Sequence, residues 1–266
     1  MPIQCRFDVE EISKNCFHEI DYRAMRHVFD IQNELGRLCH ESIYQAELVH
    51  RCTSEGLSVL AEGEIVVTHA SFHKSYFLDA LVGKGAIYEL KAVDALNGQH
   101  ESQLLNYLFL AELREGKLLN FSSPSVQHRF VSTNIEPANR YSFTIDDSGW
   151  AADIPSSGKL WAIVCDLLSD WGAFLDIKLY REALFHFLGG EEQLLSFVDI
   201  FVGERIVGHQ KMHLVDRETG LHISSTLRNV EAYRKQLFRI LNHTSLNQIQ
   251  WINFSRNEIN LVTLKK

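Results

Sequence analysis

The feature that most constrains the fold is a pair of β-rich runs, 76–82 and 86–93, separated by the tripeptide Gly-Lys-Gly. Two such runs around a short glycine-containing loop are typical of a β-hairpin. If the loop consists of these three residues, Asp79 lies directly opposite Glu89, and their Cβ atoms are roughly 4.5–5.5 Å apart. Two carboxylates at that separation repel each other unless one keeps its proton or a cation lies between them.

A lysine accompanies the two acids. Lys91 follows Glu89 by two residues, so both side chains point to the same face of the strand. A buried core does not favour such a set, because buried charges are costly unless they are paired or bind a metal ion. The hairpin therefore predicts a divalent-cation site with an adjacent cationic side chain. Taken singly, each of these residues is better interpreted as a surface residue, and only the combination favours a site.

The segment 97–114 is expected to form a helix that packs against this hairpin, because elements adjacent in sequence are usually adjacent in space. Its leucines and an alanine recur at helical spacing. Gln103 and Tyr107 are four residues apart and share one stripe of the helix. His100 lies one turn earlier, and could equally be a group that supports the site or an ordinary surface residue.

Asp79, Glu89-x-Lys91 and Gln103-x-x-x-Tyr107 together resemble the PD-(D/E)XK nuclease superfamily, in the variant whose helix carries a Gln-x-x-x-Tyr motif. Outside the hairpin and helix, the resemblance extends to a small bacterial family called the GxxExxY proteins. It covers about residues 20–133, and its further matching positions are Gly36, Glu41, Tyr44, 118–121 and Arg129. The glycine that gives that family its name falls, by position, on Leu38.

The resemblance implies a restriction-endonuclease-like core, an α/β fold with a mixed central sheet flanked by helices. It implies metal-dependent hydrolysis of a phosphodiester in nucleic acid, with DNA favoured over RNA. The ligands of Mg²⁺ (or Mn²⁺) would be Asp79, Glu89 and the Leu90 carbonyl, and Glu41 would complete the shell directly or through water.

The remaining roles that the resemblance implies belong to side chains around the metal. Lys91 would orient the attacking water or neutralise developing charge. Gln103 and Tyr107 would position the substrate backbone or the metal ligands, and Arg129 would contact the substrate.

Composition limits the alternatives. The formal net charge of the 266 residues is −8, with −6 in residues 1–133 and −2 in 134–266. An acidic chain lacks the basic footprint typical of nucleic-acid binding. A second hypothesis therefore stays open, a non-catalytic module that binds nucleic acid or protein and retains the nuclease fold. The sequence also leaves open whether the chain forms a homo-oligomer.

Other sequence features concern location and metal type. Five cysteines without a Cys-x-x-Cys motif are expected to be reduced thiols in a cytoplasmic protein. No apolar run approaches the length of a membrane span, and the N-terminus lacks the pattern of a signal peptide. Two histidine pairs, 69/73 and 209/213, have ligand-like spacing but no neighbouring cysteines, so a zinc site is not expected.

The second half is expected to repeat the first. Residues 1–135 would form the nuclease-like domain, 136–159 a turn-rich linker, and 160–266 a degenerate copy. The motif Leu-Asn-Phe at 119–121 matches Ile-Asn-Phe at 252–254. This match aligns position 119 with position 252, so equivalent positions in the two halves are 133 residues apart.

This offset places residues without a carboxylate on the catalytic positions of the second copy, since Asp79 maps to Met212 and Glu89 to His222. Chance similarity between two α/β halves is the simpler alternative. Arg228, Lys235 and Arg239 are near-aligned on an expected helix and would either contact phosphates or form a solvated face.

Overall fold

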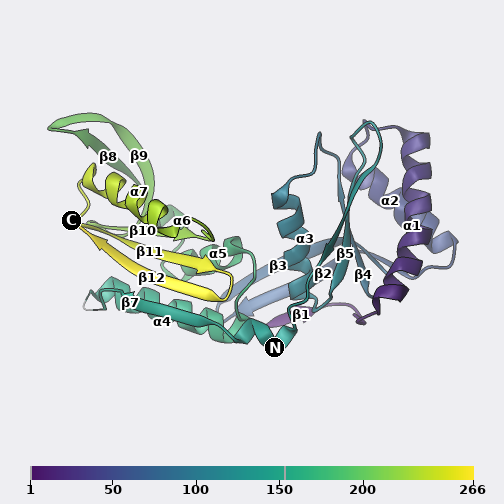
Figure 1. Ribbon diagram of the computed structural model, residues 1–266, viewed down its shortest axis with the longest axis horizontal. Coiled ribbons are helices and arrows are strands. Elements are labelled where there is room, and N and C mark those ends of the chain that lie inside the picture. The colour runs from purple at the N-terminus through teal and green to yellow at the C-terminus, as the bar shows by residue number, and fades with distance from the viewer. Residues whose placement is uncertain (1, 153) are drawn as a thin grey trace. The chain divides into compact units, whose positions relative to one another are not determined.

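The computed structural model describes residues 2–152 and 154–266 and divides into two compact units, one ending at Pro137 and one beginning at Ala138. Each unit holds one six-stranded mixed sheet flanked by helices (Figure 1). The α/β fold class with a mixed, restriction-endonuclease-like core is therefore confirmed, and two such sheets fit a duplicated core. No helix in the described part of the chain is long and apolar enough to cross a membrane.

The first unit begins with a short strand and two helices, and its remaining strands are interrupted by one helix. In chain order its elements are β1 (Ile3–Cys5), α1 (Lys14–Leu35), α2 (Glu41–Ser54), β2 (Val59–His69), β3 (Phe72–Val82), β4 (Ala86–Lys91), α3 (Gly98–Leu110), β5 (Glu115–Asn120) and β6 (Gln127–Ser132).

The predicted hairpin is formed by β3 and β4. Its ladder pairs Val82 with Ala86 and ends at the pair Ala80 and Tyr88, which is the register expected from a three-residue loop. The loop is a tight turn in which Gly83 and Lys84 both have φ of 61°. β3 and β4 therefore stop pairing one residue before Asp79 and Glu89. On its other edge, β4 pairs in parallel with β5 from Ile87 to Lys91.

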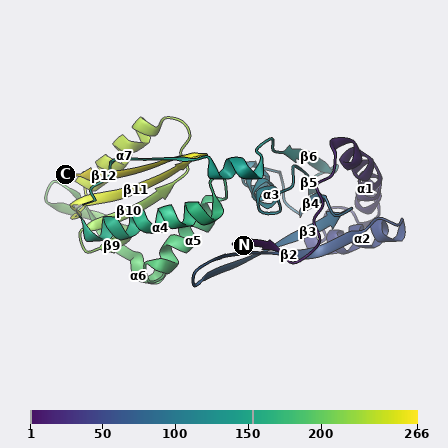
Figure 2. The same ribbon diagram turned by 90° about the horizontal axis from the view of Figure 1, so that it is seen from below.

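Helices cover both faces of the first sheet. α1 and α2 pack on one face, where their apolar stripes meet Tyr88 and Leu90 of β4. α3 lies on the other face, against β4, β5 and β6 (Figures 1 and 2). Because side chains alternate along a strand, Glu89 faces the α3 side. The helix α1 begins at Lys14, where Ser13 caps it by accepting a hydrogen bond from the Cys16 amide.

The second unit follows a similar order after an initial short helix and strand. Its elements are η1 (Pro137–Tyr141), β7 (Thr144–Gly149), α4 (Pro155–Trp171), α5 (Ile177–Phe187), α6 (Glu191–Leu194), β8 (Leu195–Val202), β9 (Arg205–Asp216), β10 (Thr219–Ser224), α7 (Val230–Asn242), β11 (Gln248–Ser255) and β12 (Glu258–Lys265).

The two sheets share their topology and most of their register. In the first sheet, each strand from β2 to β6 pairs with the next, and every pairing is antiparallel except that of β4 with β5, which is parallel. Strands β8 to β12 pair in the same way, with β10 and β11 as the parallel pair. The pair Ala80 and Tyr88 corresponds to His213 and Leu221, both at the offset that the sequence motifs indicate. The sheets differ at their edges, because β1 pairs with β2 whereas β7 pairs with β12.

Equivalent side chains also make equivalent contacts in the two units. The Tyr44 hydroxyl donates to the carbonyl of Gly36 at 2.9 Å, and that of Tyr180 donates to Gly172 at 2.5 Å. Both glycines end a helix with φ of 71° and 72°, a conformation that a side chain would disfavour. The two tyrosine rings stack on Phe121 and Phe254, with centroids 4.4 and 4.6 Å apart.

An asparagine near the end of β5, and its counterpart on β11, are used in the same way in both units. Asn120 accepts from the amide of Val93 and donates to its carbonyl. Asn253 makes the same two bonds to Thr226, so both partners are again related by that offset. The correspondence therefore extends from strand order to individual hydrogen bonds.

Parts of the second unit differ from what the sequence suggested. The segment 136–159, expected as a linker, contains η1, β7 and the beginning of α4, and β7 is an edge strand of the second sheet. The linker expected there therefore does not exist as a separate segment, and α4 continues to Trp171 before Gly172 ends it. All five cysteines are free.

Candidate active site

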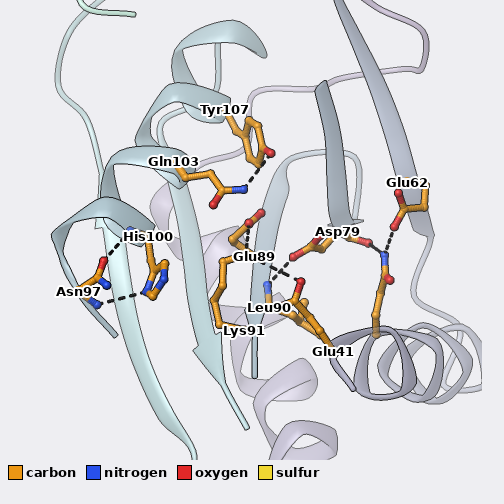
Figure 3. A network of polar contacts seen from close by, with 11 residues as sticks. Glu41, Glu62, Asp79, Glu89, Leu90, Lys91, Asn97, His100, Gln103 and Tyr107 are labelled. Atoms are coloured by element: carbon orange, nitrogen blue, oxygen red, sulfur yellow. Dashed lines mark hydrogen bonds and ion pairs between the residues drawn. The ribbon is translucent and has the colours of Figure 1, made fainter. Parts of the chain in front are cut away.

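The acids and the lysine of the hairpin lie together at the point where β3 and β4 diverge (Figure 3). The predicted residues come from four elements, since Glu41 begins α2, Asp79 lies on β3, Glu89 and Lys91 on β4, and Gln103 and Tyr107 on α3. The structure thus brings together all six residues to which catalytic roles were assigned.

Asp79 is fixed by the backbone of the opposite strand. The amide of Leu90 donates a hydrogen bond to Asp79 Oδ2 at 2.7 Å. The backbone pairing of β3 with β4 ends at Ala80 and Tyr88, and this side-chain bond links the two strands beyond that point. Burial raises the pKa of Asp79 to about 6, although the Leu90 amide and the nearby Lys91 ammonium favour its ionised form.

Glu89 is the most buried acid of the site, with 1% of its surface exposed. Burial, and then the charge of Asp79, raise its pKa to about 8 against the opposing effect of Lys91. Its Oε1 accepts a hydrogen bond from Lys91 Nζ at 2.6 Å. Its Oε2 is buried and has no hydrogen-bond partner among the residues that the structure describes. The interpretation of Glu89 as a solvated surface acid is therefore wrong.

Lys91 is the cation among these acids. Its Nζ lies 2.6 Å from Glu89 Oε1 and 3.9 Å from Glu41 Oε1, and only 12% of its side chain is exposed. Burial lowers the pKa of Lys91, but the surrounding carboxylates outweigh it, and the net pKa is raised. The lysine therefore stays protonated across the physiological range.

Gln103 and Tyr107 form a hydrogen-bonded pair above the acids. Gln103 Nε2 donates to the Tyr107 hydroxyl at 3.1 Å, so the hydroxyl proton is directed to another acceptor. Burial and the charge of Glu89 raise the pKa of Tyr107 to about 12, which keeps that proton in place. His100 instead caps α3, where its Nδ1 accepts from the Asn97 amide (Figure 3).

Gln45 and Glu62 belong to the same network and were not found by sequence reasoning. Gln45 Nε2 donates to the backbone carbonyl of Asp79 at 2.8 Å and to Glu62 Oε1 at 2.6 Å. Glu62 lies at an irregularity of β2, where its φ is 53°. Gln45 follows Glu41 by one helical turn, which is the signal that could have identified it.

The donor set fits a divalent cation of the Mg²⁺ type. All the candidate ligands are oxygens, and the buried Oε2 of Glu89 is the atom that most needs a partner. Among the described residues, no group of three or more His, Cys, Asp and Glu side chains could hold a metal ion. Mg²⁺ commonly keeps several waters and binds through one or two carboxylates plus substrate phosphates, so Asp79 and Glu89 suffice for that mode.

The residues predicted to contact substrate are more dispersed. Arg129 on β6 pairs with Glu101 and donates to the Leu96 carbonyl. Lys235 and Arg239 lie on α7 in the second unit, and both line an open groove beside β12. Arg228 precedes α7 and is exposed, and it is not among the residues that line this groove.

The second unit carries different side chains at the positions of the acids. By register, Met212 stands where Asp79 does and His222 where Glu89 does. His222 Nε2 lies 2.7 Å from the Tyr233 hydroxyl, and burial lowers the pKa of this histidine to about 4. The equivalent position therefore holds neutral groups in place of two carboxylates.

A mixed sheet flanked by helices, with two acids and a lysine where two strands diverge, is the arrangement that the motifs predicted. Residues 18–131 match a family model described as "PD-(D/E)XK nuclease superfamily". The match covers somewhat less than half of the chain, and it agrees with the superfamily that the motifs predicted.

The other comparisons add little to this assignment. The chain is similar to the solved structure titled "Crystal structure of SSO0001", with 16% identity and a TM-score of 0.26. That similarity covers 47% of this chain and 66% of the other. No curated protein matches the chain.

The raised pKa of Glu89 leads to a prediction about stability. Between pH of about 4.5 and about 8 the folded protein keeps a proton that the unfolded chain has lost. The free energy of unfolding therefore falls as pH rises through this window. Glu89→Gln removes the titration, so in EDTA the variant should be more stable than the wild type by at least about 1 kcal/mol near pH 8, or roughly 2–4 °C in Tm.

Thermal melts in EDTA across this pH window test the prediction. The gain from Glu89→Gln should grow as the pH increases. Glu19→Gln, at an exposed position of α1, is the matched control and should give no such trend. A variant that is less stable than the wild type at pH 8 would show that the Glu89 carboxylate is not destabilising in the metal-free protein.

Proposed function

We propose that the first unit hydrolyses phosphodiester bonds in nucleic acid, with DNA the favoured substrate, in a reaction that depends on Mg²⁺ or Mn²⁺. The observation that carries the proposal is the buried Glu89 carboxyl, which lies beside Asp79 and Lys91 and has an oxygen without a partner among the described residues. Such an arrangement costs folding free energy, and a bound cation would offset that cost. The family match supports phosphodiester hydrolysis as the reaction class.

Asp79, Glu89 and the carbonyl of Leu90 would hold the metal, and Glu41 would complete the shell directly or through water. A bound divalent cation supplies Lewis acidity toward the phosphate and lowers the pKa of a coordinated water. The Leu90 amide holds Asp79 in position through its hydrogen bond to Oδ2. Gln45 holds the backbone of Asp79 from the other side.

Lys91 would stabilise the negative charge that develops on the phosphate in the transition state. Its ammonium is retained because three carboxylates surround it. Glu89 would serve as a ligand of the metal, and the Lys91 ammonium beside it would interact with the phosphate or the attacking water. Tyr107 would donate its hydroxyl proton to a substrate oxygen or a ligand, since Gln103 already donates to that hydroxyl.

We infer that the second unit is a diverged duplicate without catalytic residues. The shared strand order, register and tyrosine–glycine contacts support common descent better than chance similarity. The finer assignment to the GxxExxY proteins is also a proposal. Its signature glycine is replaced by Leu38, which is 92% exposed, and the helix-ending role falls to Gly36.

A cleavage panel on the full chain tests the proposed activity. Single- and double-stranded DNA and RNA are incubated with Mg²⁺, Mn²⁺ or EDTA, and the products are resolved by electrophoresis. We expect cleavage with either metal and none in EDTA, with DNA cut faster than RNA. If nucleic acid is bound but never cut under any of these conditions, the nuclease proposal is wrong and a non-catalytic binding module is the better account.

A further inference from the structure

The second unit contains an open groove between α7 and the end of β12 that carries a concentration of positive charge. Four basic side chains and one aromatic ring line it, and one acid lies among them: Arg234, Lys235, Phe238, Arg239, Lys265 and Glu231. Arg234 lies 3.8 Å from Glu231. No hydrogen bond or ion pair within the described part of the chain engages the side chains of Lys235, Arg239 or Lys265. This charge is therefore available to an external anion.

The geometry of α7 places these side chains on one flank. Leu237 and Leu241 are buried and pack the helix onto the sheet. Lys235 and Arg239 are four residues apart, so they lie one above the other on the exposed side of the helix. Phe238 stays 41% exposed between the cations. A large apolar ring that keeps this much of its surface exposed is accessible to a ligand.

The first unit provides an internal comparison. At the offset that relates the two units, the positions of Arg234, Lys235, Arg239 and Lys265 are occupied in α3 and β6 by Glu101, Ser102, Asn106 and Ser132. None of these four is basic, and Glu101 is already paired with Arg129. The basic groove is therefore a property of the second unit and not a general consequence of the shared fold.

We propose that this groove binds single-stranded nucleic acid, with phosphates on the basic side chains and a base stacked on Phe238. Basic grooves that carry exposed aromatic rings suit single strands, because unpaired bases expose their faces for stacking. The groove would also provide the positive charge that a chain with a net charge of −8 otherwise lacks. The proposal rests on the proposed function in one respect, that the bound strand belongs to the substrate of the first unit.

Binding is tested on the full chain with a fluorescently labelled single-stranded oligothymidine in EDTA, by anisotropy over a series of salt concentrations. The triple variant Lys235→Ala/Arg239→Ala/Lys265→Ala should bind at least about tenfold more weakly at low salt. The slope of log affinity against log salt should fall in magnitude by about 2, because three phosphate contacts each release about 0.7 counterion from a single strand. Phe238→Ala should weaken binding at least about fivefold while leaving the slope unchanged.

The matched control removes the same charge elsewhere in the second unit. Lys159→Ala/Lys178→Ala/Arg205→Ala replaces three exposed cations outside the groove and should retain nearly the wild-type affinity and slope. An equal loss in this control, or an unaltered slope in the groove variant, would overturn the proposal. Equal binding of a blunt duplex, together with no effect of Phe238→Ala, would overturn its assignment to a single strand.

Because EDTA removes any cleavage, this experiment separates the groove from the active site. A chain that binds through the groove but never cuts would disprove the nuclease activity alone. A chain that cuts normally with all three groove cations removed, and that binds the oligothymidine as tightly as the wild type, would disprove the groove alone.

Discussion

Asp79→Asn and Glu89→Gln should each abolish cleavage. Each substitution keeps the shape of the side chain and removes an anionic oxygen that the metal needs. The loss should be complete, because the second unit offers no substitute site: Met212 and His222 stand at the equivalent register positions. The measurement is initial cleavage rate against Mg²⁺ and Mn²⁺ concentration, with the products resolved by electrophoresis.

The matched control is Asp94→Asn, which neutralises an exposed acid in the segment after β4. It should cut at the wild-type rate. Circular dichroism must show that all three variants are folded, and Glu89→Gln is expected to be at least as stable as the wild type for the reason given above. Wild-type cleavage by Asp79→Asn would end the proposal that this acid holds the metal.

The metal should bind weakly until nucleic acid is present. Among the described residues, no group of three or more His, Cys, Asp and Glu side chains is placed to hold the ion, and the Lys91 ammonium already pairs with Glu89. Calorimetric titration of Mg²⁺ into the free chain should therefore give a weak isotherm that Asp79→Asn reduces further. A strong isotherm that persists in Asp79→Asn would place the metal elsewhere.

Local sequence patterns predicted the centre of the site well. The Gly-Lys-Gly loop fixes the register of the hairpin, and a register fixed at the turn decides which side chains face each other. The helical spacing of Gln103 and Tyr107 likewise follows from the geometry of one helix. Each of these predictions depends on residues close together in the sequence.

Contacts between distant segments could not be predicted in this way. Gln45 reaches Asp79 and Glu62 only because α2 packs beside β2 and β3. β10 is short and buried on both faces, so its sequence lacks the alternation that marks a half-buried strand. β7 was assigned to a linker because its pairing with β12 joins segments that lie far apart in the sequence.

Burial was the other property that the sequence could not provide. A Glu-x-Lys pair occurs on many exposed strands, where both charges are solvated and contribute little. Here Glu89 is 1% exposed and its pKa is raised to about 8, which changes its chemistry. The pKa of Glu89 is raised because α3 packs over β4 and buries this side chain, and that packing is visible only in the folded chain.

Lys91→Ala should lower the rate of the chemical step by about 100–1000-fold while changing substrate affinity little, because the proposed role of the ammonium is to stabilise the transition state. Single-turnover cleavage measured with enzyme in excess gives the rate, and anisotropy in Ca²⁺ or EDTA gives the affinity. Lys84→Ala is the matched control, since this lysine is half exposed on the neighbouring loop and its ammonium lies 3.7 Å from Asp8. It should leave both quantities unchanged.

Two further variants separate a catalytic role of Lys91 from a structural one. Lys91→Met keeps the length of the side chain without its charge and should be as slow as the alanine variant. Lys91→Arg keeps the charge and should recover part of the rate, because the guanidinium can still reach Glu89 but spreads its charge over a larger group. If Lys91→Met turns over at the wild-type rate and only its affinity falls, Lys91 binds substrate and takes no part in the chemical step.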